Sequence, residues 1–137
     1  MQRRSFSIQI ALLLGSIVGC NGGNNLASVE GIVTLDGQPL PNANVIFEGQ
    51  GPQGDSASAY TDANGHFQLK DTIQTVGAKP GQYLVRITAQ AVDEYSKPPA
   101  IPPKYNRNSQ ILVTVTNGSN TFNYELKSDP RYKSVEQ

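Results

Sequence analysis

YTDANGHFQL, residues 60–69, is the stretch that decides the fold of this 137-residue chain. It predicts two short strands joined by a tight turn as a β-hairpin. Asp62 can accept hydrogen bonds from nearby backbone amides, while Asn64 and Gly65 tolerate the positive φ that such a turn demands. The same logic of short strands and turns is repeated on both sides of this stretch.

Seven strands with alternating apolar and polar residues are expected, over about 27–35, 44–48, 57–61, 66–69, 82–88, 110–116 and 121–126. Asp36-Gly37 supplies positive φ for the first turn, and Pro39 and Pro41 are expected to keep their span out of any strand ladder. Strands with one apolar face bury those faces only when two sheets stack. The sequence therefore predicts an all-β fold, a seven-stranded β-sandwich. Its predicted core is Val29, Val33, Leu35, Val45, Phe47, Phe67, Leu69, Tyr83, Val85, Ile87, Ile111, Val113, Val115, Phe122, Tyr124 and Leu126.

The composition agrees with one β-rich domain. The chain has 13 Gly, 9 Pro, no Trp and 16% charged residues, which favours turns and strands over amphipathic helices. Eleven basic residues balance eleven acidic ones, and no run of like charges occurs. Nothing therefore indicates nucleic-acid binding.

The N-terminus is typical of an export signal. Arg3-Arg4 precedes an apolar run over 8–18, which is shorter than the roughly 20 residues of a membrane-spanning helix. Ile17-Val18-Gly19-Cys20 resembles the lipobox of bacterial lipoproteins, whose cysteine is lipidated and becomes the new N-terminus. We expect a signal peptide over 1–19, a lipidated Cys20 with a flexible tether over 20–27, and export to a cell-envelope membrane that holds the chain by its lipid. The alternative is an unmodified residue, but this sole cysteine has no disulfide partner.

Two export routes are compatible with the signal. Arg3-Arg4-Ser5-Phe6 resembles the start of a twin-arginine signal, which would export an already folded protein. The other interpretation is a plain basic region of an ordinary secretory signal. We favour the second, because a pair of arginines is a weak signal.

The longest irregular stretch is the loop over 90–108, where four prolines between 98 and 103 favour extended backbone. Compact domains rarely carry such a loop without a purpose. Tyr95 and Tyr105 are therefore candidate ligand contacts, because aromatic faces stack on sugars and peptides. The alternative is that both tyrosines pack the loop onto the sandwich. The polar C-terminal tail over 127–137 is expected to be loose.

Four segments together resemble the carboxypeptidase regulatory-like domain. They are VEGIV (29–33), GQPLPNANV (37–45), TDANGHF (61–67) and GQYLV (81–85). The resemblance covers about 28–126 and implies a transthyretin-like, or prealbumin-like, Greek-key sandwich. It also implies a non-catalytic accessory module, because the catalytic part of such proteins lies in another domain.

Small bacterial lipoproteins with one such domain are similar in layout, since they carry a Pro-Lys-Tyr element like Pro103-Lys104-Tyr105 before the last two strands. The expected function is accordingly a non-catalytic, membrane-anchored envelope lipoprotein that acts as a structural or protein-interaction module. Its partner would be an envelope protein or a glycan. The alternative is a carbohydrate- or peptide-binding module that uses the loop over 90–108.

Enzymatic chemistry is not expected. Transthyretin-like folds include a hydrolase of 5-hydroxyisourate that depends on several histidines, an arginine and a C-terminal Tyr-Arg-Gly-Ser tail. This chain has a single histidine, His66, and ends in Ser134-Val135-Glu136-Gln137. His66 lies one position before inward-pointing Phe67, so it is expected to face solvent, and a lone imidazole is a poor metal site. We expect no catalytic residue, no metal and no cofactor.

Overall fold

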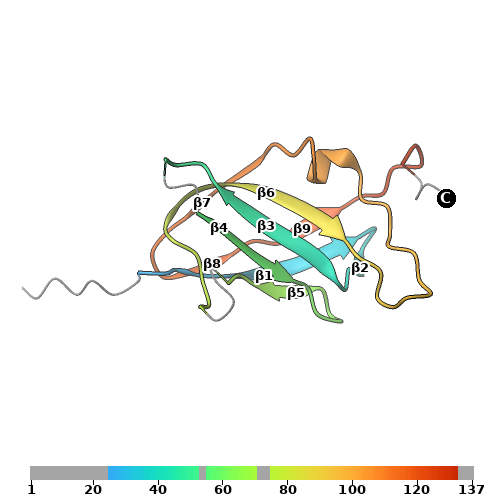
Figure 1. The fold of residues 1–137 in the computed structure, drawn as a ribbon, viewed down its shortest axis with the longest axis horizontal. Coiled ribbons are helices and arrows are strands. Elements are labelled where there is room, and N and C mark those ends of the chain that lie inside the picture. The colour runs from blue at the N-terminus through green and yellow to red at the C-terminus, as the bar shows by residue number, and fades with distance from the viewer. Residues whose placement is uncertain (1–24, 53–54, 71–74, 133–137) are drawn as a thin grey trace, which may run out of the picture.

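The computed structural model describes residues 25–52, 55–70 and 75–132, which form two β-sheets packed on each other (Figure 1). The predicted signal peptide, Cys20 and most of the predicted tether lie outside the described residues, as do the last five residues of the tail. This architecture confirms the predicted all-β sandwich. The described strands are β1 (Ser28–Leu35), β2 (Gln38–Pro39), β3 (Ala43–Gly49), β4 (Ser56–Tyr60), β5 (His66–Gln68), β6 (Gly81–Ala89), β7 (Ile111–Val115), β8 (Ser119–Thr121) and β9 (Tyr124–Leu126), with one short 3-10 helix, η1 (Pro103–Tyr105).

Seven of these strands correspond to the predicted ones, and β2 and β8 are additional short pieces. The expectation that prolines exclude a ladder after the first turn is wrong, because Pro39 pairs with Thr34. The next residue, Leu40, donates its N–H to the Val33 carbonyl oxygen at 3.0 Å. Thr34 and Pro39 therefore form a pair whose amides point away from each other, so the missing N–H of proline loses no hydrogen bond.

The prediction that the strands on either side of the turn at 60–69 pair with each other is also wrong, although the turn itself is present. Strand β4 pairs with β3 in one sheet, whereas β5 pairs with β1 in the other. The turn carries the chain between the layers because Thr61 anchors it. The Thr61 hydroxyl donates to the Leu40 carbonyl oxygen at 2.6 Å and accepts from the Ala43 N–H at 2.9 Å.

Within this turn, the predicted role of Asp62 is confirmed. Its Oδ1 accepts hydrogen bonds from the N–H groups of Asn64 and His66, at 2.9 and 3.0 Å. Gly65 adopts a φ of 75°, but Asn64 does not adopt positive φ. His66 is half-exposed, with Nε2 3.4 Å from Oε2 of Glu30.

Strand β1 is the centre of the first sheet. It pairs antiparallel with β5 on one side and parallel with β8 and β9 on the other. Gly31 lies where the ring of Phe67 and the carbonyl oxygen of Phe122 press against the strand, and a Cβ there would overlap that oxygen. Only glycine fits this position without movement of the backbone.

The predicted core is confirmed. Every residue predicted to point inward is either buried or packed against the buried cluster. Leu35, Ile111, Val113, Phe122 and Tyr124 are the partly buried ones. Phe47 joins the two layers, since its ring centroid lies 5.9 Å from that of Tyr83 in its own sheet and 5.8 Å from that of Phe122 beside β8.

The two sides of the sandwich differ. On the side of β4 and β5, Ser58 and Lys70 exchange backbone hydrogen bonds at 3.1 and 3.2 Å and link the two sheets. On the other side, β7 ends the second sheet, whose order is β4-β3-β6-β7. No described strand pairs with the outer edge of β7. Within the described ranges, no helix is long and apolar enough to cross a membrane.

Candidate functional site: a cleft between the proline-rich loop and the tail

The loop over 90–108 is fixed to the sandwich at its C-terminal half. Arg86 on β6 bonds Oε1 of Glu48 through Nε at 2.8 Å and the carbonyl oxygen of Asn106 through Nη1 at 2.7 Å. Pro102 is fully buried, and η1 follows it directly. These contacts hold one wall of a cleft in place.

The start of the C-terminal tail is fixed as well, so the expectation of a loose tail does not hold for its first residues. Tyr105 accepts a hydrogen bond from the Lys127 N–H at 3.1 Å, and Asp36 accepts one from the Ser128 N–H at 2.9 Å. The hydrogen bonds from the Ser128 side chain and backbone lower the pKa of the Asp36 carboxyl. The turn after β1 thereby positions the second wall of the cleft.

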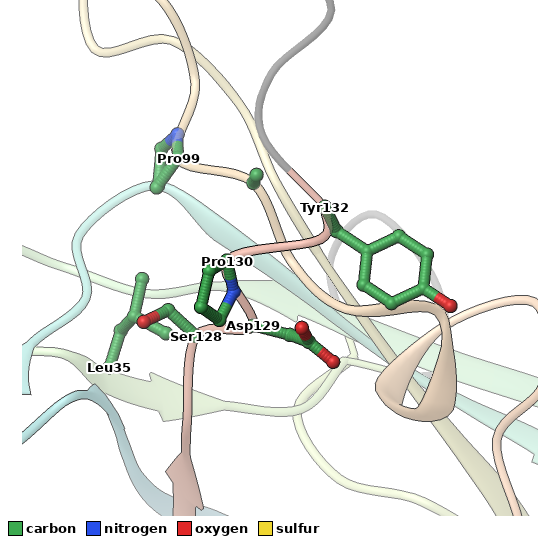
Figure 2. Close-up of a pocket in the computed structure, with 7 residues that line it drawn as sticks. Leu35, Pro99, Ser128, Asp129, Pro130 and Tyr132 are labelled. Carbon is green, nitrogen blue, oxygen red and sulfur yellow. The ribbon is translucent and has the colours of Figure 1, made fainter.

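A cleft of about 490 Å³ lies between these two segments. Figure 2 draws the residues that line it. It is lined by Leu35, Pro99, Ala100, Ser128, Asp129, Pro130 and Tyr132. A second hollow of about 290 Å³ shares Ala100 and Tyr132 with it, so the two adjoin at the tyrosine ring. The second hollow adds Ile101, Pro103, Asn106, Arg107 and Arg131.

Asp129 and Arg131 shape the tail at the cleft. The guanidinium of Arg131 donates two hydrogen bonds to the carboxylate of Asp129, from Nη2 to Oδ2 at 2.7 Å and from Nε to Oδ1 at 3.0 Å. Hydrogen bonds from the Arg131 side chain and then its backbone lower the pKa of Asp129 to about 2. Arg131 also lies over the ring of Tyr132, 5.8 Å from its centroid. One arginine therefore holds both the carboxylate and the aromatic ring.

The two tyrosines predicted as ligand contacts are placed differently from each other. Tyr95 is 90% exposed and projects from the first half of the loop. Tyr105 packs against the core, with Lys104 Nζ 4.9 Å from its ring centroid. Neither lines the cleft. The alternative interpretation, in which tyrosine packs the loop onto the sandwich, describes Tyr105 but not Tyr95.

Sequence reasoning missed Tyr132 and Asp129, because the tail was treated as a polar end without structure. Asp129-Pro130 is a turn signal, and an arginine and an aromatic residue follow it. That combination was the available indication of an ordered segment. Among the described residues, no group of three or more His, Cys, Asp or Glu could hold a metal ion.

The fold defines the class of this protein as an all-β sandwich with an ordered loop–tail cleft at one end. The chain belongs to the family described as "Domain of unknown function (DUF6795)", whose model matches residues 29–97. The match covers β1 to β6 and stops before the part of the loop that lines the cleft. No curated protein matches the chain.

Three solved structures are distantly similar. A DUF3823 family protein from Bacteroides ovatus ATCC 8483 has 17% identity and a TM-score of 0.49 over 73% of this chain and 44% of its own. A DUF3823 family protein from Parabacteroides merdae ATCC 43184 has 21% identity and a TM-score of 0.43 over 73% and 45%. Catechol 1,2-dioxygenase from Acinetobacter sp. ADP1 has 14% identity and a TM-score of 0.40 over 80% and 54%. This chain thus spans less than half the length of the two DUF3823 proteins.

Proposed function

We propose that this chain is a non-catalytic lipoprotein of the cell envelope, anchored through lipid on Cys20, whose sandwich makes protein contacts through the open edge of β7. The observation that carries the proposal is the unpaired edge itself. A free edge strand presents backbone donors and acceptors that a strand from a partner can satisfy.

The direction of the backbone groups supports this use of β7. The Gln82 carbonyl oxygen accepts a hydrogen bond from the Gln50 N–H at 2.9 Å, so the backbone of Gln82 faces β3. Gln82 pairs with Thr114, and in an antiparallel ladder both members of such a pair point away from each other. The N–H and C=O groups of Thr114, and by alternation those of Leu112, therefore point to the outer edge.

The side chains of β7 do not block the edge. Proteins usually protect exposed edges with charged residues, proline or a bulge. The strand Ile111–Val115 contains neither charge nor proline, and Leu112 is 68% exposed on it. Leu84 on β6 pairs with Leu112 and extends the apolar surface inward from the edge.

We also propose that the sandwich is a carboxypeptidase regulatory-like domain. Two features agree with that assignment: VEGIV lies on the central strand β1, and TDANGHF carries the chain from one sheet to the other. A module of this kind has no chemistry of its own, which agrees with an accessory role in the envelope.

The anchor is tested by Cys20→Ser. We expect the full-length variant to lose incorporation of labelled palmitate completely, because serine has no thiol to carry the two or three acyl chains that, at about 0.8 kcal/mol for each buried methylene, would hold the chain to the bilayer. Ser16→Ala, also in the signal region, is the control and should be labelled and fractionate like the unchanged protein. Continued palmitate labelling of Cys20→Ser would contradict a lipid anchor at this residue.

The edge contact is tested by photo-crosslinking in intact envelopes, with benzoylphenylalanine placed at Gln110 beside β7. We expect Leu112→Lys to reduce the yield of the cross-linked partner at least about tenfold, because a desolvated charge on the edge replaces an apolar contact worth about 1.5–3 kcal/mol. Val92→Lys changes an equally apolar residue that is 61% exposed elsewhere, and should leave the yield unchanged. Equal yields in the two lysine variants would exclude the β7 edge as the contact surface.

A second candidate function is binding of carbohydrate or peptide by the loop over 90–108. The observation that favours it is the loop–tail cleft. Pro99 and Ala100 of that loop line the cleft, and Tyr132 of the tail lines it in place of Tyr95 and Tyr105.

A further inference from the structure

We propose that the loop–tail cleft binds an acidic carbohydrate, a short chain of uronate sugars, across the ring of Tyr132. This inference deepens the second candidate function and does not depend on the β7 edge. It rests on the shape of the cleft, its apolar lining and the sign of the charges around it.

The shape suits an extended ligand. The two hollows, about 490 and 290 Å³, meet at Ala100 and Tyr132 and together have the size of a typical small-ligand site. An oligosaccharide of two or three rings can place one ring on each side of the tyrosine. Tyr132 is 41% exposed although Arg131 lies over its ring, so part of the residue remains open to a ligand.

The lining suits sugar rings. Leu35, Pro99, Pro130 and Tyr132 supply apolar side chains to the lining (Figure 2), and the C–H face of a pyranose can pack against such groups. Ser128 on the same cleft and Asn106 on the adjoining hollow carry groups that hydrogen-bond hydroxyls. A few polar groups at the rim of an apolar surface fix the orientation of a bound ligand.

The charges favour an anion. Arg131 is already neutralised by the carboxylate of Asp129, which is 2.7 Å from its guanidinium. Arg107 lines the second hollow and has no ion-pair partner among the described residues. Lys104 lies close enough to Asp129 to lower its pKa further. Among the described residues, the unmatched charge beside Tyr132 is therefore positive, and a guanidinium recognises a carboxylate with two parallel hydrogen bonds.

A peptide fits the same surface less well. Peptides dock by adding a strand, by laying a helix into a groove, or by a polyproline helix against aromatic walls. Among the described strands, only β1 contributes to the lining, and it does so with one residue, Leu35. Tyr132 is the one aromatic residue that lines the two hollows. The experiment must therefore distinguish an acidic carbohydrate from an acidic peptide as the ligand of the cleft.

The cleft also lies away from the proposed anchor. Strand β1 runs from Ser28, near the N-terminal end, to Leu35 at the cleft. Its eight residues span about 25 Å. Figure 1 shows the N-terminal end and the tail at opposite ends of the sandwich. An anchored chain would hold the cleft away from the bilayer, within reach of a polysaccharide.

The test is calorimetric titration of the full-length lipidated protein in detergent micelles with trigalacturonate. We expect saturable binding, and binding at least about tenfold weaker for the fully methyl-esterified trisaccharide, which keeps the sugar rings but loses the carboxylates. Arg107→Gln and Tyr132→Ala should each weaken trigalacturonate binding about tenfold or more.

Two matched variants serve as controls. Lys70→Gln removes an exposed cation that lines neither hollow, and Tyr95→Ala removes an exposed tyrosine outside the cleft. Both should leave the affinity unchanged. Absence of trigalacturonate binding, equal binding of the methyl ester, or equal loss in Lys70→Gln would overturn the proposal, and tighter binding of poly-L-glutamate would assign the cleft to an acidic peptide. Leu112→Lys should retain trigalacturonate binding, which separates this result from the fate of the β7 contact.

Discussion

Gly31→Ala is expected to lower the free energy of unfolding by about 3 kcal/mol, at the upper end of the cost of overpacking a core. The new Cβ would overlap the carbonyl oxygen of Phe122 and lie 2.9 Å from Cε1 of Phe67. Strand β1 cannot move away from these atoms, because it is paired on both sides. Thermal unfolding followed by circular dichroism should show a fall in Tm of about 10 °C.

Gly51→Ala is the matched control for this substitution. A Cβ at Gly51 would meet no atom within 4 Å, and its φ is not positive. The same change of one methyl group should therefore leave Tm within about 2 °C of the unchanged protein. Similar Tm values for Gly31→Ala and Gly51→Ala would show that β1 is not held against Phe122 as described.

Phe47→Ala is expected to cost about 3–5 kcal/mol, the usual loss when a large core aromatic residue is removed and its cavity stays partly open. Phe47 has no exposed surface, and its ring contacts Tyr83 and Phe122. Its removal thus loosens the second sheet from the first. Urea unfolding, with the midpoint and the slope fitted separately, measures the loss.

Phe47→Leu and Tyr95→Ala are the controls for that measurement. Leucine fills much of the space and should cost only about 1 kcal/mol. Tyr95 is 90% exposed, so its truncation should change stability by less than about 0.5 kcal/mol. A cost for Phe47→Ala no larger than that for Tyr95→Ala would contradict a shared core between the two sheets.

The sequence predicted the layers well because the apolar alternation is a local signal. Val45 and Phe47 on β3, and Val85 and Ile87 on β6, lie two positions apart and share the inner face of their strands, and all four are fully buried. Ile32 breaks the alternation in β1, and the structure places it 44% exposed on the outer face. Apolar residues at every second position therefore identify the face of a strand that is buried in the core.

The pairing partners were less predictable, because they depend on contacts between distant residues. Nothing in the sequence at 60–69 distinguishes a hairpin from a turn between sheets. The difference lies in Thr61, whose buried hydroxyl bonds Leu40 and Ala43, about twenty positions earlier. A turn signal specifies local backbone geometry, whereas the sheet on each side of it is selected by the whole core.

The candidate site was harder still to predict. Tyr95 and Tyr105 stood out because they flank a run of prolines, yet only the tertiary structure reveals that Tyr105 turns inward. Tyr132 approaches the loop because Tyr105 and Asp36 hold Lys127 and Ser128, respectively, by hydrogen bonds. Such contacts join residues up to 92 positions apart, so they produce no periodic pattern in a sequence.

The parallel pairing of β1 with β8 and β9 has a consequence for biogenesis. The Ile32 N–H bonds the Asn123 side chain, 91 residues later in the chain. A nascent polypeptide emerges N-terminus first, so β1 exists without half of its neighbours until the last strands have followed. Closing so long a loop is slow, since its entropy is lost before the contacts form. A chain still being synthesised therefore leaves β1 with a bare edge, and such an edge is open to pairing with strands of other chains.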